Sequence, residues 1–150
     1  MPPSKRIYQT QKLDFYTIDH QTKLEIPLFE SPISAGFPSP AEDYVDLKLD
    51  LNKFLIKHPS ATFYVRVKGD SMKNASIFDG DILIVDKALD PKNDDIAVCV
   101  LDGEFTVKRI RRHNDQLYLI PENPDFQPIK ITDNDDFKIW GIVSYVIHKP

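Results

Sequence analysis

The pattern of hydrophobic and polar positions divides the chain into two parts. From residue 61 onward, short apolar runs are separated by turn residues and are rich in β-branched and aromatic side chains, which is typical of strands. Six or seven such runs indicate a mainly β, compact and mostly antiparallel fold. The runs predict strands at 61–67, 81–86, 96–101, 104–110, 116–120 and 137–147.

A turn signal indicates how two of these strands pair. Asp102-Gly103 lies between the runs 96–101 and 104–110, and this dipeptide is typical of a two-residue hairpin loop. The two runs should therefore lie side by side. Alternation along the second run puts Lys108 on the same face as Ile110.

The segment before residue 61 has a helical pattern near its end. Ser39, Pro40 and Glu42 form a capping box, with a hydroxyl at the cap and a proline at the first helical position. Apolar residues recur at helical spacing within 41–57, and Asp50 is a candidate cap for a second helix. We therefore expect one or two short helices here.

The first 38 residues have the composition of an extended N-terminal arm. Six of the twelve prolines lie within the first 40 residues, where they prevent a continuous helix and favour extended or turning backbone. Apolar residues are also frequent in this segment. We therefore expect the arm to lie against a surface of the β-rich domain.

Composition limits the class of protein. The chain has 150 residues, 41% of them hydrophobic, and a net charge of -4, which fits one folded domain and excludes a polycation or a disordered chain. Cys99 is the only cysteine, so neither an intrachain disulfide nor a multi-cysteine zinc site can form. We expect no metal and no cofactor. Apolar runs stay well below the roughly 18 residues that a membrane span needs, so we expect no membrane contact and a cytoplasmic location.

Two residues are candidates for chemistry. Ser71 follows a β-branched strand and Gly69, and the four histidines show no triad spacing around it. Taken alone, Ser71 is an ordinary turn residue and Lys108 a solvated lysine on a strand face. A lysine can take the proton of a serine only when it is neutral, so burial would have to lower its pKa from about 10.4 to roughly 7 to 8. The backbone N–H groups of Ser71 and Met72 are candidates to hold the oxyanion.

Three separated motifs resemble the LexA/UmuD family of self-cleaving serine peptidases: Ala35-Gly36, Gly69-Asp70-Ser71-Met72 and Thr106-Val107-Lys108. Within this family, the segments 36–41, 43–45, 50–52 and 58–62 are similar to the UmuD-like branch. The resemblance covers about residues 33–148 and implies a LexA/UmuD-type peptidase domain. It also implies a scissile bond between Ala35 and Gly36, with Ser71 as nucleophile and Lys108 as general base. Residues 1–25 extend beyond the usual arm of that branch.

The resemblance also implies a biological role. Self-cleavage would remove the arm, residues 1–35, from the β-rich domain, residues 36–150. Proteins of this branch form homodimers and cleave themselves when a RecA filament forms on single-stranded DNA. They then serve a UmuC-like error-prone DNA polymerase in translesion synthesis, as part of the SOS response to DNA damage.

Other functions remain as alternatives. The chain could be a non-cleaving β-rich interaction module in which Ser71 and Lys108 are relics, or a LexA-type repressor that lacks its DNA-binding domain. A signal-peptidase-like enzyme would share the serine and lysine chemistry but should carry a membrane anchor. Strand alternation splits the basic run 108–113 between two faces, so we do not expect direct DNA binding through it.

Overall fold

A computed structural model of the protein describes residues 6–9, 13–19, 25–29 and 45–150. One α-helix, α1 (Leu51–Leu55), and two 3-10 turns, η2 (Pro59–Ala61) and η3 (Lys73–Ala75), accompany the strands. The strands are β1 (Arg6–Gln9), β2 (Leu13–Thr17), β3 (Glu25–Phe29), β4 (Val45–Asp50), β5 (Thr62–Val67), β6 (Ile82–Asp86), β7 (Ile96–Leu101), β8 (Glu104–His113), β9 (Gln116–Ile120), β10 (Ile129–Ile131) and β11 (Phe137–Ile147).

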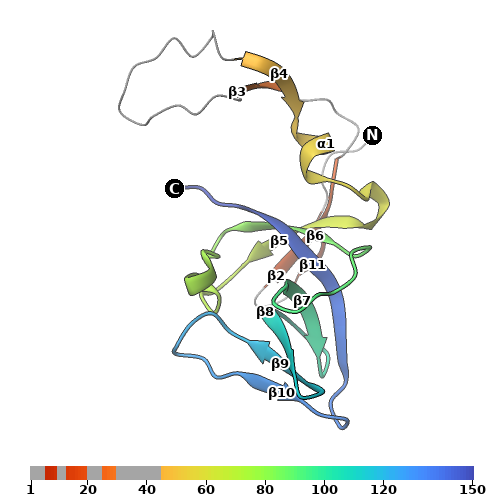
Figure 1. The fold of residues 1–150 in the computed structure, drawn as a ribbon, viewed down its shortest axis with the longest axis vertical. Coiled ribbons are helices and arrows are strands. Elements are labelled where there is room, and N and C mark those ends of the chain that lie inside the picture. The colour runs from red at the N-terminus through yellow and green to blue at the C-terminus, as the bar shows by residue number, and fades with distance from the viewer. Residues whose placement is uncertain (1–5, 10–12, 20–24, 30–44) are drawn as a thin grey trace.

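Nine of these strands form one antiparallel sheet. Its order is β1-β2-β5-β6-β11-β7-β8-β9-β10, so the long strand β11 pairs with β6 on one side and with β7 on the other. β3 and β4 form a separate two-stranded ribbon, which lies at the opposite end of the molecule's long axis from β9 and β10 (Figure 1). None of the described helices is long and apolar enough to cross a membrane.

The large sheet curls, so that strands far apart in its order meet across a core. The rings of Phe15 on β2 and Phe105 on β8 have centroids 4.8 Å apart, although four strands lie between β2 and β8 in the sheet. This core cluster also contains Val65, Leu83 and Val98, all fully buried. A second cluster, around Ala97, Cys99 and Leu119, is formed by residues of β7, β8, β9 and β11. The curl therefore brings the end of β5 and the middle of β8 toward each other.

The mainly β fold and its six predicted strands are confirmed. The turn at Asp102 and Gly103 has φ angles of 50° and 84°, the left-handed pair that a two-residue type I′ hairpin needs. The register across it pairs Leu101 with Glu104. The short strand β10, which contains only three residues, was not predicted.

Of the one or two short helices expected within 41–57, the structure contains one, and the helical interpretation of residues 45–50 is wrong. Residues 45–50 form strand β4, because Val45, Leu47 and Leu49 alternate with polar residues and pair with β3. Only Leu51–Leu55 is helical, and Asp50 caps it as expected, with its Oδ1 accepting a hydrogen bond from the N–H of Asn52 at 3.1 Å. The predicted cap at Ser39, Pro40 and Glu42 lies outside the described residues.

The N-terminal segment is more than an arm lying on a surface. β2 pairs along its whole length with β5, and the side chains of Leu13 and Phe15 are 2% and 1% exposed. β3 tolerates Pro27 because each strand of a two-stranded ribbon is an edge strand, where a missing N–H donor is not needed. Part of the segment expected to be an arm is therefore a strand of the core.

Candidate active site

Ser71 lies in the loop that follows the end of β5. Gly69 has a φ of +97°, a conformation that glycine adopts without a steric penalty. Its N–H donates to Oδ1 of Asp79 at 2.8 Å, which fixes the exit from the strand. The chain then enters η3, where the N–H of Lys73 donates to the carbonyl of Asp70 at 3.2 Å. Ser71 therefore lies in a short, internally bonded turn.

Lys108 approaches this turn from the middle of β8. Its side chain is buried, with only 7% of the residue exposed, so the solvated lysine expected of an isolated strand face is not what the fold contains. Nζ of Lys108 lies 3.2 Å from Oγ of Ser71. It also bonds Oγ1 of Thr106 at 2.8 Å and the carbonyl oxygen of Val107 at 3.1 Å. The structure thus brings together the serine and the lysine singled out from the sequence.

This arrangement is suited to moving a proton from a hydroxyl to an amine. A neutral amine has two N–H donors and one lone pair. Thr106 and Val107 can accept the two N–H bonds, which turns the lone pair toward the hydroxyl of Ser71. Burial favours the neutral amine over the charged one, because a charge loses solvation in the interior.

Cys99 lies near Lys108 but acts as an apolar residue of the core. It faces Thr106 across the β7 and β8 pairing and is fully buried. Burial raises the pKa of the Cys99 thiol to about 12, although Lys108, in its protonated form, acts in the other direction. The thiol therefore stays protonated and acts as a small apolar side chain of the core.

The candidate oxyanion donors are the N–H groups of Ser71 and Met72. Neither donates a hydrogen bond to another backbone group within the described residues. The side chain of Met72 is 2% exposed and belongs to the main core cluster, which anchors the turn. The two donors are thus held on a fixed backbone.

A loop that the sequence analysis did not single out holds the Ser71 turn from the other side. Nδ2 of Asn123 donates to the carbonyl of Asp70 at 2.8 Å, and Asn123 is only 3% exposed. The N–H of Glu122 contacts Sδ of Met72 at 3.4 Å, and its carbonyl accepts from the N–H of Asn74 at 2.7 Å. The sequence signal, an asparagine between Pro121 and Pro124, indicates only a turn.

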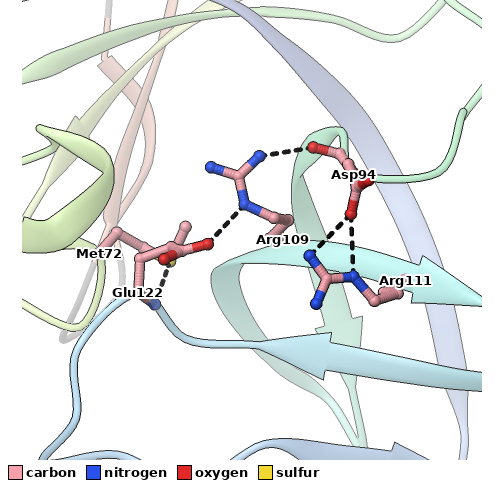
Figure 2. A network of polar contacts seen from close by, with 5 residues as sticks. All are labelled: Met72, Asp94, Arg109, Arg111 and Glu122. Atoms are coloured by element: carbon pink, nitrogen blue, oxygen red, sulfur yellow. Dashed lines mark hydrogen bonds and ion pairs between the residues drawn. The ribbon is translucent and has the colours of Figure 1, made fainter.

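The same loop is tied to the strand that carries Lys108. Figure 2 shows Nε of Arg109 bound to the carboxylate of Glu122, at 2.6 Å, and Arg111 bound to Asp94. Arg109 also donates to the backbone carbonyl of Asp94 at 2.6 Å. These two arginines of the basic run are therefore engaged with acidic and carbonyl groups of their own chain.

A cleft of about 490 Å³ opens beside Ser71 and Lys108. It lies between the Ser71 turn, the start of β8 and the loop that leads into β10. Phe126 on this loop is 44% exposed, which is unusual for a large aromatic side chain. The other apolar lining residues are Leu101, Phe105 and Ile129. The cleft thus presents an apolar wall next to a hydroxyl and an amine.

The predicted scissile pair, Ala35 and Gly36, lies outside the described residues. The segment that contains it begins after β3 and ends before β4. These two strands pair from Glu25 with Asp50 to Phe29 with Val45. The pair is therefore carried between the two strands of one hairpin.

Comparison with known proteins agrees with this geometry. A model of the Peptidase S24-like family matches residues 27–144. Protein SamA of Salmonella typhimurium is 45% identical over 123 residues, which are 82% of this chain and 85% of SamA. Protein MucA of Escherichia coli is 40% identical over 136 residues, 89% of this chain and 92% of MucA. The LexA repressor of Bordetella parapertussis is 38% identical over 125 residues, which are 83% of this chain and 57% of the repressor. The chain therefore belongs to the Peptidase S24-like family, as a UmuD-like member of the LexA/UmuD group of self-cleaving serine peptidases.

Proposed function

We propose that the protein cleaves its own chain between Ala35 and Gly36, with Ser71 as nucleophile and Lys108 as general base. The observation that carries this proposal is the 3.2 Å contact between Nζ of the buried Lys108 and Oγ of Ser71. A nucleophile and its base must lie within hydrogen-bond reach, and this pair does so at the edge of a cleft.

The reaction has two stages. Oγ of Ser71 attacks the carbonyl carbon of Ala35 while Nζ of neutral Lys108 takes the hydroxyl proton. The negative oxygen that forms is held by the N–H groups of Ser71 and Met72. The bond to the nitrogen of Gly36 then breaks, and Lys108 gives its proton to that leaving amine. An ester between Ala35 and Ser71 remains, and a water that Lys108 deprotonates hydrolyses it to a free carboxyl group and a free serine.

The substrate segment fits such a site by its chemistry. Ala35 and Gly36 are small, so their backbone can approach Oγ closely. Ile33, two residues upstream, offers an apolar side chain for the apolar part of the cleft. Because the segment belongs to the same molecule, effective molarities of about 10⁵ to 10⁸ M are accessible to a well-placed bond.

The biological role we propose is that of a UmuD-like SOS mutagenesis protein. A RecA filament on single-stranded DNA stimulates the cleavage of a cytoplasmic homodimer. The cleaved protein then acts as an accessory subunit of a UmuC-like translesion DNA polymerase. The support for this role is membership of the UmuD-like group, together with SamA and MucA as relatives at 45% and 40% identity.

The test is the intact mass of the purified protein after incubation at pH 10, where a lysine is readily neutral. We expect two fragments, residues 1–35 and residues 36–150, and no fragments from the Ser71→Ala variant under the same conditions. A large fragment that begins at a residue other than Gly36 would contradict the assigned bond. An uncut wild-type protein would instead favour the non-cleaving interaction module.

A further inference from the structure

The N-terminal strand β2 is built into the domain that contains the candidate active site. Its five residues pair in register with β5, from Leu13 opposite Val67 to Thr17 opposite Phe63. β5 is the strand that leads directly to Ser71. Residues 1–35 therefore supply a backbone partner to the catalytic half of the sheet.

The side chains of β2 complete the core. The ring centroid of Phe15 lies 4.8 Å from that of Phe105 on β8 and 4.9 Å from that of Trp140 on β11, both in edge-on geometry. Trp140 in turn lies 5.2 Å from Phe63 on β5. Phe15 is thus a central member of a four-ring cluster, and its removal would leave a cavity bordered by three strands.

Two further contacts join β2 to the Ser71 turn. The carboxylate of Asp14, whose side chain is 8% exposed, bonds Nζ of Lys68 at 2.9 Å. Lys68 directly precedes the turn. Leu13 also lines a small cavity of about 20 Å³ together with Ser71 and Thr106. Apolar, ionic and backbone contacts therefore hold the same strand.

A second pairing also spans the proposed cut. β3 lies before the segment 30–44 and pairs with β4 after it. Cleavage at Ala35 and Gly36 would leave β1, β2 and β3 in the small fragment, while β5 and β4, the partners of β2 and β3, remain in the large one. The match to the family begins at residue 27, so β1 and β2 are additions to the matched domain.

We propose that self-cleavage does not release residues 1–35, and that the product is a two-chain complex of 1–35 with 36–150. The edge of β5 that pairs with β2 is a binding site for an extended strand. This strand carries two apolar side chains with one carboxylate between them, and residues 13–17 of the cut fragment occupy the site. This inference rests on the proposed cleavage for its biological setting. Its physical basis, the pairing of β2 with β5, does not depend on how the bond is cut.

The first experiment uses the self-cleaved protein after its return from pH 10 to neutral pH. Mass spectrometry under denaturing conditions should report two fragments, while native mass spectrometry and size-exclusion chromatography should report both in one particle. Separation of free 1–35 from a folded 36–150 at micromolar concentration would overturn the proposal.

A second experiment separates this proposal from the failure of self-cleavage. In a Ser71→Ala variant, residues 31–37 are replaced by the recognition sequence of a site-specific protease, which cuts the chain from outside. The two fragments should again stay together. If wild-type protein does not cut itself but this complex persists, the proposed function fails and the strand-binding site stands.

Matched variants identify the contacts that hold the fragment. Phe15→Ala should speed fragment dissociation by about tenfold or more, because it removes the ring that fills the core. Tyr16→Ala changes a half-buried residue on the other face of β2 and should change the rate far less. Equal rates for the two variants would contradict the proposal. If Phe15→Ala does not fold, exchange of bound 1–35 for an excess of labelled synthetic 1–35 on the wild-type complex gives the same rate, and exchange within seconds would overturn the proposal.

Discussion

The side chain of Asn123 donates a hydrogen bond to the carbonyl oxygen of Asp70, the residue before Ser71, over a separation of 53 residues. The neighbouring Glu122 binds Arg109, the residue after Lys108. One loop therefore touches both the turn that carries the candidate nucleophile and the strand that carries the candidate base. We therefore expect this loop to hold the turn at a fixed distance from the strand.

Asn123→Ala should therefore slow self-cleavage by about tenfold or more, because small displacements of a nucleophile from its base are costly in rate. It should also lower the free energy of unfolding by about 0.5–1.5 kcal/mol, since the carbonyl of Asp70 loses the hydrogen bond from Asn123 and keeps only the one from the N–H of Lys73. Cleavage is followed by intact mass at a temperature where circular dichroism shows a folded variant. Asn134→Ala, at an exposed position, is the control, and equal cleavage by both variants would show that the loop does not position the turn.

Lys108→Arg should abolish cleavage at every accessible pH. Arginine keeps its proton and cannot serve as a base. Lys138→Arg, the same substitution at an exposed position, is the control, and this variant should cleave as the wild-type protein does. The readout is the fraction of cut chain after incubation from pH 7 to pH 10. Wild-type rates in Lys108→Arg would refute the general-base role.

Gly141→Ala should destabilise the centre of the sheet. A Cβ at this position would lie 2.6 Å from Cγ1 of Val85, which is fully buried, so a neighbouring group has to shift at a cost of about 1–3 kcal/mol. Urea unfolding measures the effect. Gly141→Ala should cost less stability when it is added to the Val85→Ala protein than when it is added to the wild-type protein. Additive losses would mean that the clash with Val85 is not the cause.

Cys99 should make the protein less stable in strong alkali. Its pKa is raised from 9.0 to about 12 by burial, so above pH 9 the unfolded chain loses a proton that the folded chain keeps. The stability that the buried thiol contributes is therefore complete below pH 9 and falls as the pH rises toward 12, by at most about 1.4 kcal/mol per pH unit.

The check for Cys99 is urea unfolding at pH 8, 9 and 10. Cys99→Ala should show a smaller loss of stability above pH 9 than the wild-type protein, after its constant packing cost is subtracted. Parallel curves for the two proteins would show that the thiol does not contribute. The native thiol should also resist alkylation at pH 8 and react after unfolding.

Local patterns predicted those strands whose alternation or apolar content was unambiguous, and the turn at Asp102 and Gly103 predicted their pairing. The same reasoning misread β4, because Val45 and Leu49 are four residues apart and fit a helix as well as a strand until Leu47 and the partner strand β3 are considered. Tertiary pairing decided between the two.

At the candidate site, too, the sequence identified some residues, whereas their arrangement depends on the tertiary structure. Motifs identified Ser71 and Lys108, but their separation of 3.2 Å depends on the curl of the sheet, which no short segment encodes. Asn123 was missed because its partner is a backbone carbonyl, which carries no side-chain signal. The role of Phe15 was missed because the rings around it come from β5, β8 and β11.

The position of β11 in the sheet also sets when the candidate site can assemble during synthesis. β11 is the last strand to be made, yet it is the backbone link between β6 and β7 within the described sheet. Ser71 belongs to the half built from β2, β5 and β6, and Lys108 to the half built from β7 to β10. A growing chain therefore contains both residues before it contains the strand that joins their halves. We therefore expect the order of translation to delay the encounter of Ser71 with Lys108 until β11 has been made.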